Sequence, residues 1–351
     1  MRVLFVTRKY PPRVGGMENL SYGLLSGFPE PKTTITWGGS QAHLLWFLPY
    51  VFLRVALTAH RYDVIHLGDA MLCAGGLLPR LLGKKVAISV HGLDLTFRPR
   101  IYQAYLRLFL RADAFIANSE STRRLAEARG LTQVRAISIG VPERYFSVSR
   151  ATHRDAELEQ RRSGRVALVT VGRLVPRKGA AWFVRNVLPR LSNVLYVVVG
   201  VGAHRAEIER AAAETGMTDN VWLTGSVSDA RLLDLLGSSD VFVMPNIAVP
   251  GNVEGFGIVA IEASASGLPI VASRLEGIPD AVIDGENGLL VPPEDASAFV
   301  SLLSDLVESP ERRRALGESG RAYTERRYSW PRIIDQYRAL FEQLITGTSQ
   351  S

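Results

Sequence analysis

The feature that most constrains this chain is an alternation of short apolar segments with longer helical patterns. In the first 150 residues, five runs rich in β-branched side chains begin at Val3, Asp63, Val86, Ala114 and Val134. Runs that are apolar throughout indicate strands buried on both faces, as in a parallel sheet covered by helices. We therefore predict a doubly wound α/β domain for residues 1–150.

The alternation stops over residues 147–165, where the sequence is polar and charged without an apolar period. We interpret this segment as a linker, because a chain of 351 residues exceeds the size at which one core usually keeps growing. Five further runs begin at Val166, Leu195, Val221, Asp240 and Pro269. Residues 151–330 are predicted to form a second Rossmann-like domain, with a ligand in the crevice outside the strand ends.

Simple features exclude several classes of protein. Cys73 is the only cysteine, so no internal disulfide is expected and a reducing cytoplasm fits best. The N-terminal apolar run is short and is interpreted as a first strand rather than a signal peptide. The longest apolar stretch, residues 44–53, contains Pro49 and is too short to span a bilayer. Its length favours a buried helix or an interfacial one.

Charge is distributed unevenly between the two halves. Residues 1–150 hold 20 Lys and Arg against 9 Asp and Glu, a balance of +11, while residues 151–351 hold 21 against 25, a balance of −4. A basic half predicts an anionic partner, either a membrane surface or a nucleic acid. Aromatic residues are not interleaved with the charges as stacking on bases requires, so no nucleic acid is expected.

One segment of the basic half bears directly on the membrane. Arg100, Arg107 and Arg111 fall on one helical stripe, and Ile101, Tyr105 and Leu108 fall on another. Contact with anionic lipid explains this pattern. A solvated helix that covers the sheet explains it equally well, and both interpretations stay open.

Two glutamates flank a Gly-Phe-Gly turn in the second half of the chain. The loop NVEGFG follows a predicted strand, and IVAIEASAS is a short helix closed by Gly267. The free N–H groups and the dipole at that helix N-terminus favour a phosphate. Glu254 precedes this position, and Glu262 lies about 6 to 7 Å further along the axis. Because carboxylates accept hydrogen bonds from hydroxyls, the pattern suits a ligand built as sugar, diphosphate and ribose.

Two further clusters are predicted to face the same crevice. Arg173 and Lys178 follow the first strand of the second domain and supply cations for a diphosphate. Gly15 and Gly16 follow the first strand of the first domain, where backbone can approach a ligand closely. Each pair alone is a weak signal, but the two coincide with the glutamate loop.

The chain resembles the retaining glycosyltransferases of the GT4 type, which have the GT-B fold of two Rossmann-like domains facing a central cleft. The resemblance covers nearly the whole chain and rests on PPRVGGMENL, HGLD at His91, IANSESTRRL, VGRLVPRKG, EGFGIVAIEASASGLPIVAS and EGIPDAVIDGENGLLVPP. The spacing of Glu254 and Glu262, followed by Ala-x-Gly-x-Pro, is its most specific part. It also implies that the C-terminal helix, residues 331–346, packs back on the first domain.

The resemblance implies a role for each candidate residue. Arg173 and Lys178 would neutralise the leaving diphosphate, and Glu262 would bind the ribose diol. Glu254 would hold hydroxyls of the transferred sugar, with His91 close to the reaction centre. The remaining donor-binding residues would act mainly through their backbone: Gly15, Gly16, Gly255, Phe256, Gly257 and Ile258.

The expected reaction is the transfer of a hexose from a nucleoside-diphosphate sugar to an acceptor hydroxyl on a sugar, a lipid or a lipid-linked glycan. The sequence offers no convincing nucleophile, so same-face attack guided by the diphosphate is favoured. No Asp-x-Asp occurs in the chain, and neither a metal nor a cofactor is expected. The expected location is the cytoplasm, either free or at the inner face of the cytoplasmic membrane.

Two functions other than glycosyl transfer are compatible with the fold. A sugar-nucleotide epimerase on a similar fold is disfavoured by the Glu254 and Glu262 spacing. A non-catalytic binder of membrane or nucleic acid is disfavoured because the charged residues that transfer needs are intact. One departure from the family pattern concerns the loop geometry, since Glu276 stands where related sequences commonly have glycine. Asn118, Ser119 and Asp94 are interpreted as helix-capping residues and are left out of the catalytic set.

Overall fold

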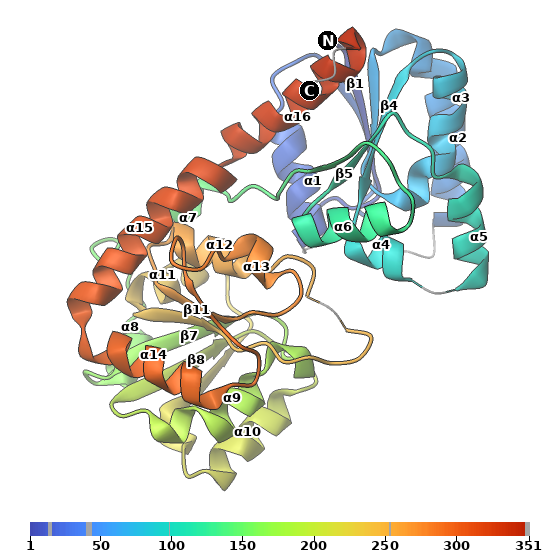
Figure 1. Cartoon of the computed structure of the whole chain (residues 1–351). Coiled ribbons are helices and arrows are strands. Elements are labelled where there is room, and N and C mark those ends of the chain that lie inside the picture. Colours follow the sequence, from blue (N-terminus) through green and yellow to red (C-terminus); the bar gives the residue numbers. More distant parts are fainter. Residues whose placement is uncertain (13–15, 40–43, 98, 253, 348–351) are drawn as a thin grey trace. The chain divides into compact units, whose positions relative to one another are not determined.

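All ten predicted strands are present in the computed structural model, which describes residues 1–12, 16–39, 44–97, 99–252 and 254–347. They form two sheets in which every strand pairs parallel to its neighbours (Figure 1). The chain folds into two compact units, residues 1–140 with 330–351 and residues 141–329, here called unit 1 and unit 2. Two Rossmann-like α/β units are the fold predicted from the sequence.

Unit 1 contains a six-stranded sheet. In spatial order its strands are β2 (Lys32–Thr36), β1 (Val3–Thr7), β3 (Val64–Leu67), β4 (Lys85–Val90), β5 (Ala114–Ala117) and β6 (Val134–Ala136). Its α-helices are α1 (Gly16–Gly27), α2 (Leu44–Thr58), α3 (Leu77–Leu81), α4 (Gly92–Thr96), α5 (Arg100–Phe109), α6 (Glu120–Ala128) and α16 (Trp330–Thr346). Short 3-10 helices lie at Ala59–Arg61 and Ala70–Gly76.

Unit 2 repeats this plan. In spatial order its strands are β12 (Leu289–Val291), β11 (Ile270–Ser273), β10 (Val241–Met244), β7 (Val166–Val171), β8 (Val194–Val199) and β9 (Val221–Gly225). Its α-helices are α7 (Glu143–Phe146), α8 (Ala156–Arg162), α9 (Ala180–Asn186), α10 (Arg205–Glu214), α11 (Asp229–Ser238), α12 (Ile258–Ala265), α13 (Ile278–Ala281), α14 (Ala296–Glu308) and α15 (Pro310–Tyr328). Short 3-10 helices lie at Pro176–Lys178, Leu188–Arg190 and Thr218–Asn220.

Two strands, β2 and β12, were not predicted, and both lie at the edge of a sheet. β2 reads KTTIT, and Ile35 is its one buried residue. β12 has three residues and follows a turn rich in glycine and charge. An edge strand buries little apolar surface, so it lacks the continuous apolar run by which the central strands were found.

The C-terminal helix α16 belongs to unit 1 by its packing. Ile333, Tyr337 and Phe341 are buried and share an apolar cluster with Phe5 and Phe28 of unit 1. The rings of Phe28 and Phe341 lie 6.0 Å apart between centroids. The last helix of the chain therefore completes the core of the unit that contains the first strand.

The segment interpreted as a linker, residues 147–165, is instead part of unit 2 and contains helix α8. The Asp155 carboxylate accepts a hydrogen bond from Leu158 N at 2.8 Å and caps this helix. Leu158 is fully buried, and Arg150 forms an ion pair with Asp240 at 2.5 Å. The charged residues that suggested a linker are thus bound to unit 2, and the chain crosses between units near Gly140, about ten residues earlier than predicted.

Candidate active site

The candidate donor site lies at the point in unit 2 where the strand order reverses. β7 and β10 are neighbours in the sheet although about 70 residues separate them, so the loops that follow them meet at one edge. In open α/β sheets such a switch point is where ligands bind. The loop after β7 contains Arg173 and Lys178, and the loop after β10 contains Glu254.

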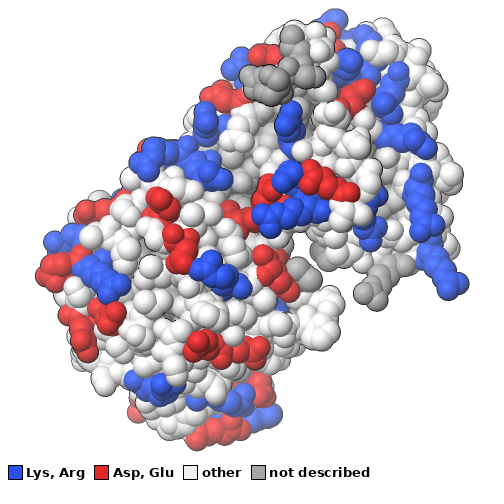
Figure 2. Space-filling view, viewed as in Figure 1, with Lys and Arg blue, Asp and Glu red and all other residues white. Residues whose placement is uncertain are grey.

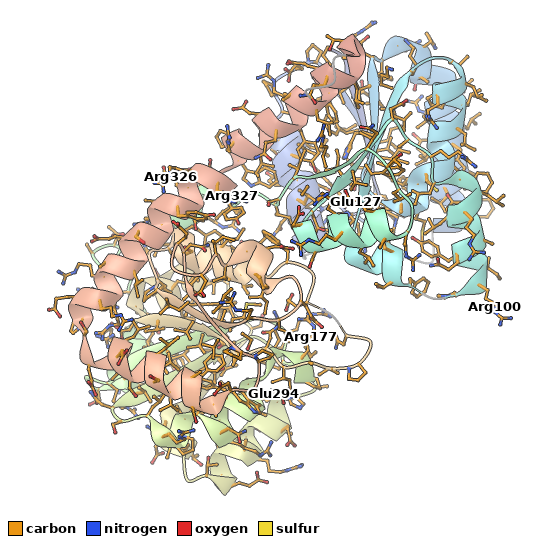
Figure 3. All side chains as sticks on the ribbon, in the orientation of Figure 1. Arg100, Glu127, Arg177, Glu294, Arg326 and Arg327 are labelled. Atoms are coloured by element: carbon orange, nitrogen blue, oxygen red, sulfur yellow. The ribbon has the colours of Figure 1, made fainter. Side chains whose placement is uncertain are left out.

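Glu254 and Lys178 are in direct contact. Lys178 Nζ lies 2.6 Å from Glu254 Oε2, and both side chains are nearly buried. Arg177 donates to the same oxygen, and Asn246 Nδ2 donates to it at 3.1 Å. Figure 3 marks Arg177 at this end of unit 2. Oε1 of Glu254 has no hydrogen-bond partner within the described part of the chain, so one oxygen of this carboxylate is free to accept from a ligand.

Arg177 and Asn246 were not among the residues predicted from the sequence. Arg177 directly precedes Lys178, and its Nε donates to Asn252 Oδ1 at 2.9 Å, which ties the two loops together. Asn246 stands two residues after the end of β10. Their position in the sequence could have indicated them, because both are polar residues just beyond strands that meet at the switch point.

Gly179 allows the two loops to approach each other. It has a left-handed φ of +69°, and a Cβ at this position would lie 1.7 Å from the Pro245 carbonyl oxygen. Ile247 N also donates to Arg177 O at 3.0 Å. The Arg-Lys-Gly sequence thus places the Lys178 ammonium against the end of β10 because its third residue has no side chain.

Burial and charge act in opposite directions on the central pair. Burial opposes ionisation of Glu254, but the charges of Lys178 and Arg177 outweigh it, and the pKa of this carboxyl is lowered. For Lys178, burial outweighs the attraction of Glu254, and Arg177 and Arg173 repel it further, so its pKa is also lowered. The site therefore has more positive charge than Glu254 neutralises, which suits an anionic ligand.

The glycine turn forms the N-terminus of α12, as the sequence predicted. Gly257 is the N-cap residue with φ +82°, and the helix begins at Ile258. The N–H groups of a first helical turn have no intrahelical acceptors. Phe256 is buried and its ring lies 6.1 Å from that of Tyr328, which fixes the turn.

The loop that contains Glu276 and Gly277 packs against the glutamate loop and hydrogen-bonds to it. Gly277 N donates to Glu254 O at 3.2 Å, and a Cβ on Gly277 would lie 2.2 Å from the Gly255 carbonyl oxygen. Glu276 adopts a left-handed φ of +53°, at the position where the resemblance expects glycine. Its carboxylate accepts a hydrogen bond from Glu254 N. This bond offsets part of the backbone strain that a non-glycine residue causes there.

Glu262 lies inside α12 and is buried, at 8% exposure. Burial raises the pKa of its carboxyl to about 7, and Arg144 and Tyr145 of α7 limit the rise. A terminal guanidinium nitrogen of Arg144 in turn lies 3.3 Å from Asp229 Oδ2. Tyr145 and Arg144 are about 117 residues from Glu262 in the sequence, and no local pattern pointed to them.

Other predicted donor residues are placed as follows. Arg173 is exposed and forms no ion pair with any described residue. Gly255 is exposed in the glutamate loop. Gly16 is the first residue of α1, and no atom lies within 4 Å of the place that a Cβ would occupy. Gly15 lies outside the described residues.

Unit 1 gathers charged side chains at its own switch point, between β1 and β3. Arg8 Nε lies 2.9 Å from Asp69 Oδ2, and both side chains are nearly buried. His91 follows β4, and its Nε2 is 3.2 Å from Gly68 O. Nδ1 of His91 is buried and has no partner among the described residues. Sequence analysis found His91 but missed Arg8 and Asp69, which carry the same strand-end signal.

Of the three residues interpreted as caps, Ser119 and Asp94 accept backbone hydrogen bonds as predicted, whereas Asn118 does not cap: its Oδ1 is buried without a partner among the described residues. Ser119 Oγ accepts from Thr122 N at 3.0 Å at the start of α6. Asp94 Oδ2 accepts from His91 N at 3.2 Å. Burial raises the pKa of the Asp94 carboxyl. In the ranges that the structure describes, no three His, Cys, Asp or Glu side chains are grouped as a metal site requires.

Family models match both units. Residues 153–323 match the model described as glycosyl transferases group 1, and residues 2–145 match glycosyltransferase family 4. Together they cover the switch-point loops of both sheets. The chain belongs to the GT4 glycosyltransferases. As a member of this family it is an enzyme that transfers a sugar from a nucleotide-sugar donor, as the sequence predicted.

Several curated relatives of this glycosyltransferase span nearly its whole length. One is the GDP-mannose-dependent alpha-(1-6)-phosphatidylinositol monomannoside mannosyltransferase of Mycolicibacterium smegmatis, 28% identical, with 93% of this chain and 95% of the relative covered. Another is a GDP-mannose-dependent monoacylated alpha-(1-6)-phosphatidylinositol monomannoside mannosyltransferase of Corynebacterium glutamicum, 27% identical, with 94% of each covered.

Solved structures show the same fold. The Anabaena protein HepE in complex with UDP matches the glycosyltransferase with a TM-score of 0.77 at 19% identity, covering 98% of this chain and all of that one. Sucrose-phosphate synthase from Thermosynechococcus elongatus matches with a TM-score of 0.73 at 22% identity, covering 99% and 100%. The fold is therefore GT-B.

Proposed function

We propose that this glycosyltransferase moves mannose from GDP-mannose to a phosphatidylinositol mannoside lipid, with retention at the anomeric carbon and without a metal ion or cofactor. The observation that carries the proposal is the shared activity in the names of four relatives matched over 93% to 94% of the chain. Partial relatives named as D-inositol 3-phosphate glycosyltransferases also act on an inositol. An inositol-containing acceptor is thus common to two groups of relatives.

The geometry of unit 2 supports a role for each donor-site group. Arg173 and Lys178 neutralise the diphosphate as it leaves, and the first-turn N–H groups of α12 bind it from the other side. Glu262 accepts hydrogen bonds from the ribose diol. Glu254 holds the sugar through Oε1, while its other oxygen is held by Lys178, Arg177 and Asn246. These positioned charges lower the barrier without a protein nucleophile.

In unit 1 we assign the acceptor side of the reaction. His91 offers Nδ1, which has no partner among the described residues, to the sugar at the reaction centre. Gly16 presents its backbone to the phosphate or sugar. Arg8 and Asp69 stand at the neighbouring strand ends and add a buried charged pair beside His91.

The donor base is tested by thermal shift. We expect GDP at 100 times its Kd to stabilise the protein by about 2.7 kcal/mol, because a ligand bound only to the folded state shifts unfolding by mass action. UDP, ADP and dTDP at the same concentration should have much smaller effects. Release of GDP from GDP-mannose in the presence of a phosphatidylinositol monomannoside then tests the acceptor. Stabilisation by UDP in place of GDP would overturn the donor assignment.

A lipid acceptor requires a surface that meets the membrane, and helix α2 of unit 1 supplies part of one. Phe47, Val51 and Val55 are buried against the sheet. On the opposite side, Trp46 is 80% exposed and Leu53 is 60% exposed, with Tyr50 and Leu57 in the same stripe. A helix that is apolar on its solvent side as well as its core side suits an interfacial position. No helix in the described part of the chain is long and apolar enough to cross a membrane.

Helices α3 and α5 extend this surface. Leu81 is 84% exposed, and in α5 Ile101 is 88% exposed and Leu108 64% exposed. The third residue of the α5 stripe, Tyr105, packs against the core of unit 1 instead. α2, α3 and α5 lie along one side of unit 1 in Figure 1, and Lys and Arg side chains follow that side in Figure 2. We infer that this side contacts anionic lipid. Of the exposed large apolar side chains in the described residues, Val201 is the one in unit 2.

Sedimentation with vesicles tests this surface. We expect binding to phosphatidylglycerol vesicles at low salt and loss of binding as salt screens the charges. Replacing Arg100 and Arg107 with glutamine should weaken binding about fivefold per residue, since each contributes about 1 kcal/mol near an anionic surface.

Substitution of exposed apolar side chains distinguishes insertion into the bilayer from electrostatic attraction to its surface. Ile101→Ser and Leu81→Ser should each weaken binding, while Val201→Ser, a single apolar-to-polar change in unit 2, should leave it unchanged. Equal binding to neutral and anionic vesicles would remove electrostatics from the proposal, and absence of binding to either would remove the membrane surface altogether.

A further inference from the structure

Unit 2 contains a cavity that the donor site does not use. It has a volume of about 340 Å³ and lies at the amino ends of β10 and β11, between Asp240, Pro269 and helix α15. The donor loops follow the carboxyl ends of strands, so the cavity is at the opposite edge of the sheet. Its volume is at the lower end of the range for small-molecule sites.

Four arginines line this cavity: Arg150, Arg313, Arg314 and Arg321. The acidic residues in the lining are Asp240 and Glu318. Asp240 is already neutralised by Arg150 at 2.5 Å and by Arg162 at 3.2 Å. The lining therefore has an excess of positive charge, and an anion is the ligand that this charge favours.

Two of these guanidinium groups, those of Arg313 and Arg321, are held in place but not saturated, while Arg314 is exposed. Arg313 donates to Leu306 O and to Val307 O. Arg321 donates through Nε to Ala265 O at 2.8 Å and through a second nitrogen to Phe146 O and Val148 O, both at 2.6 Å. Its remaining terminal nitrogen, near Gly267, has no partner in the described residues. Arg314 forms no ion pair there either. Fixed guanidinium groups with free N–H donors match the oxygen geometry of a phosphate.

We propose that this cavity binds a small soluble phosphate monoester. Arg313, Arg314 and Arg321 supply the donors to the phosphate oxygens, and the rest of the cavity holds the organic part. A membrane lipid is excluded as the source of the phosphate because the exposed apolar side chains gather on unit 1, while unit 2 contributes Val201 to the described set. Burial already lowers the pKa of Arg321, and a bound anion compensates for that cost.

Arg321 links this cavity to the two helices that surround Glu262 in the donor site. Arg321 binds the carbonyl oxygens of Ala265, at the end of α12, and Phe146, at the end of α7. The same two helices hold Glu262 beside Arg144 and Tyr145. A phosphate ester on Arg321 therefore contacts the group that joins these helices, at the end of α12 opposite to the nucleotide.

Calorimetric titration of the full chain tests the proposal, with inorganic phosphate and glycerol 3-phosphate as probes. Glycerol and sodium chloride at matched ionic strength are the controls. We expect saturable binding of both probes, tighter for glycerol 3-phosphate. Arg313→Gln with Arg314→Gln should weaken it by about tenfold or more, because charge-assisted hydrogen bonds are lost.

Two further variants locate the bound probe. Arg326→Gln removes an exposed arginine from the far end of the same helix, labelled in Figure 3, and should leave binding unchanged. Lys178→Ala, in the donor site, should also leave it unchanged. Loss of binding in Lys178→Ala but not in the Arg313 and Arg314 variant would place the probe in the donor site and overturn the proposal. The absence of saturable binding beyond the chloride control would also overturn it.

Discussion

Replacing Lys178 with alanine is expected to lower kcat by about 10² to 10³-fold, the usual effect of removing one group that stabilises charge in a transition state. Lys178 Nζ is held 2.6 Å from Glu254 Oε2 and is nearly buried. Its charge is therefore little screened where the leaving diphosphate develops negative charge. Binding of GDP should weaken as well, while binding of guanosine, which has no phosphate, should change little.

The variant needs a control for folding, because removing one partner of a buried ion pair is destabilising. In Lys178→Ala the Glu254 carboxylate keeps Arg177 as a cationic partner, so the melting temperature should fall only modestly while turnover is lost. Glu254→Ala alone should leave GDP affinity nearly unchanged and lower transfer from intact GDP-mannose. Equal losses of guanosine and GDP binding in Lys178→Ala would show that the lysine supports the fold rather than the diphosphate.

Replacing Glu262 with glutamine is expected to stabilise the free enzyme at pH 8 while weakening its binding of GDP. The pKa of Glu262 is about 7 in the folded state against 4.5 as the ordinary value. Between these pH values the folded state keeps a proton that the unfolded chain has released, so stability falls as pH rises. Above pH 7 the full cost is present, about 3 kcal/mol. Glutamine does not incur it.

Calorimetry at two pH values measures this effect. For a unit of this size, Glu262→Gln should raise the melting temperature by about 6 to 12 °C at pH 8 and by much less near pH 4.5. Glu294→Gln, an exposed carboxylate of the same unit that Figure 3 labels, should change neither. A variant that is no more stable than the wild type at pH 8 would contradict the raised pKa of the buried Glu262 carboxyl.

The affinity for GDP should change with pH in the direction opposite to that of stability. The ribose hydroxyls donate to an ionised carboxylate, so wild-type affinity for GDP should increase as pH rises through about 7. In Glu262→Gln this dependence should disappear, and affinity at pH 8 should be about tenfold lower because a neutral acceptor replaces a charged one. A wild-type affinity that does not vary with pH would place the ribose elsewhere.

The sequence by itself determined ten of the twelve strands, both parallel sheets and the helix that begins after the Gly-Phe-Gly turn. These features depend on local patterns. A strand buried on both faces must be apolar along its length, and a helix N-terminus next to a glycine turn offers free N–H groups wherever the fold places it. The positions of Lys178 and Glu254 followed, because parallel strand ends share one edge.

Tertiary structure decided what depends on residues that are distant in the sequence. Arg177 became a partner of Glu254 only because β7 and β10 are neighbours in the sheet. The charged segment 147–165 joined unit 2 because Arg150 and Asp155 find partners about 80 to 90 residues away. The pKa of Glu262 is raised because the carboxyl is buried, and it is buried only because other elements of the fold pack around α12. Local composition does not specify such partners, since a charged side chain has the same sequence signature whether it meets water or a buried opposite charge.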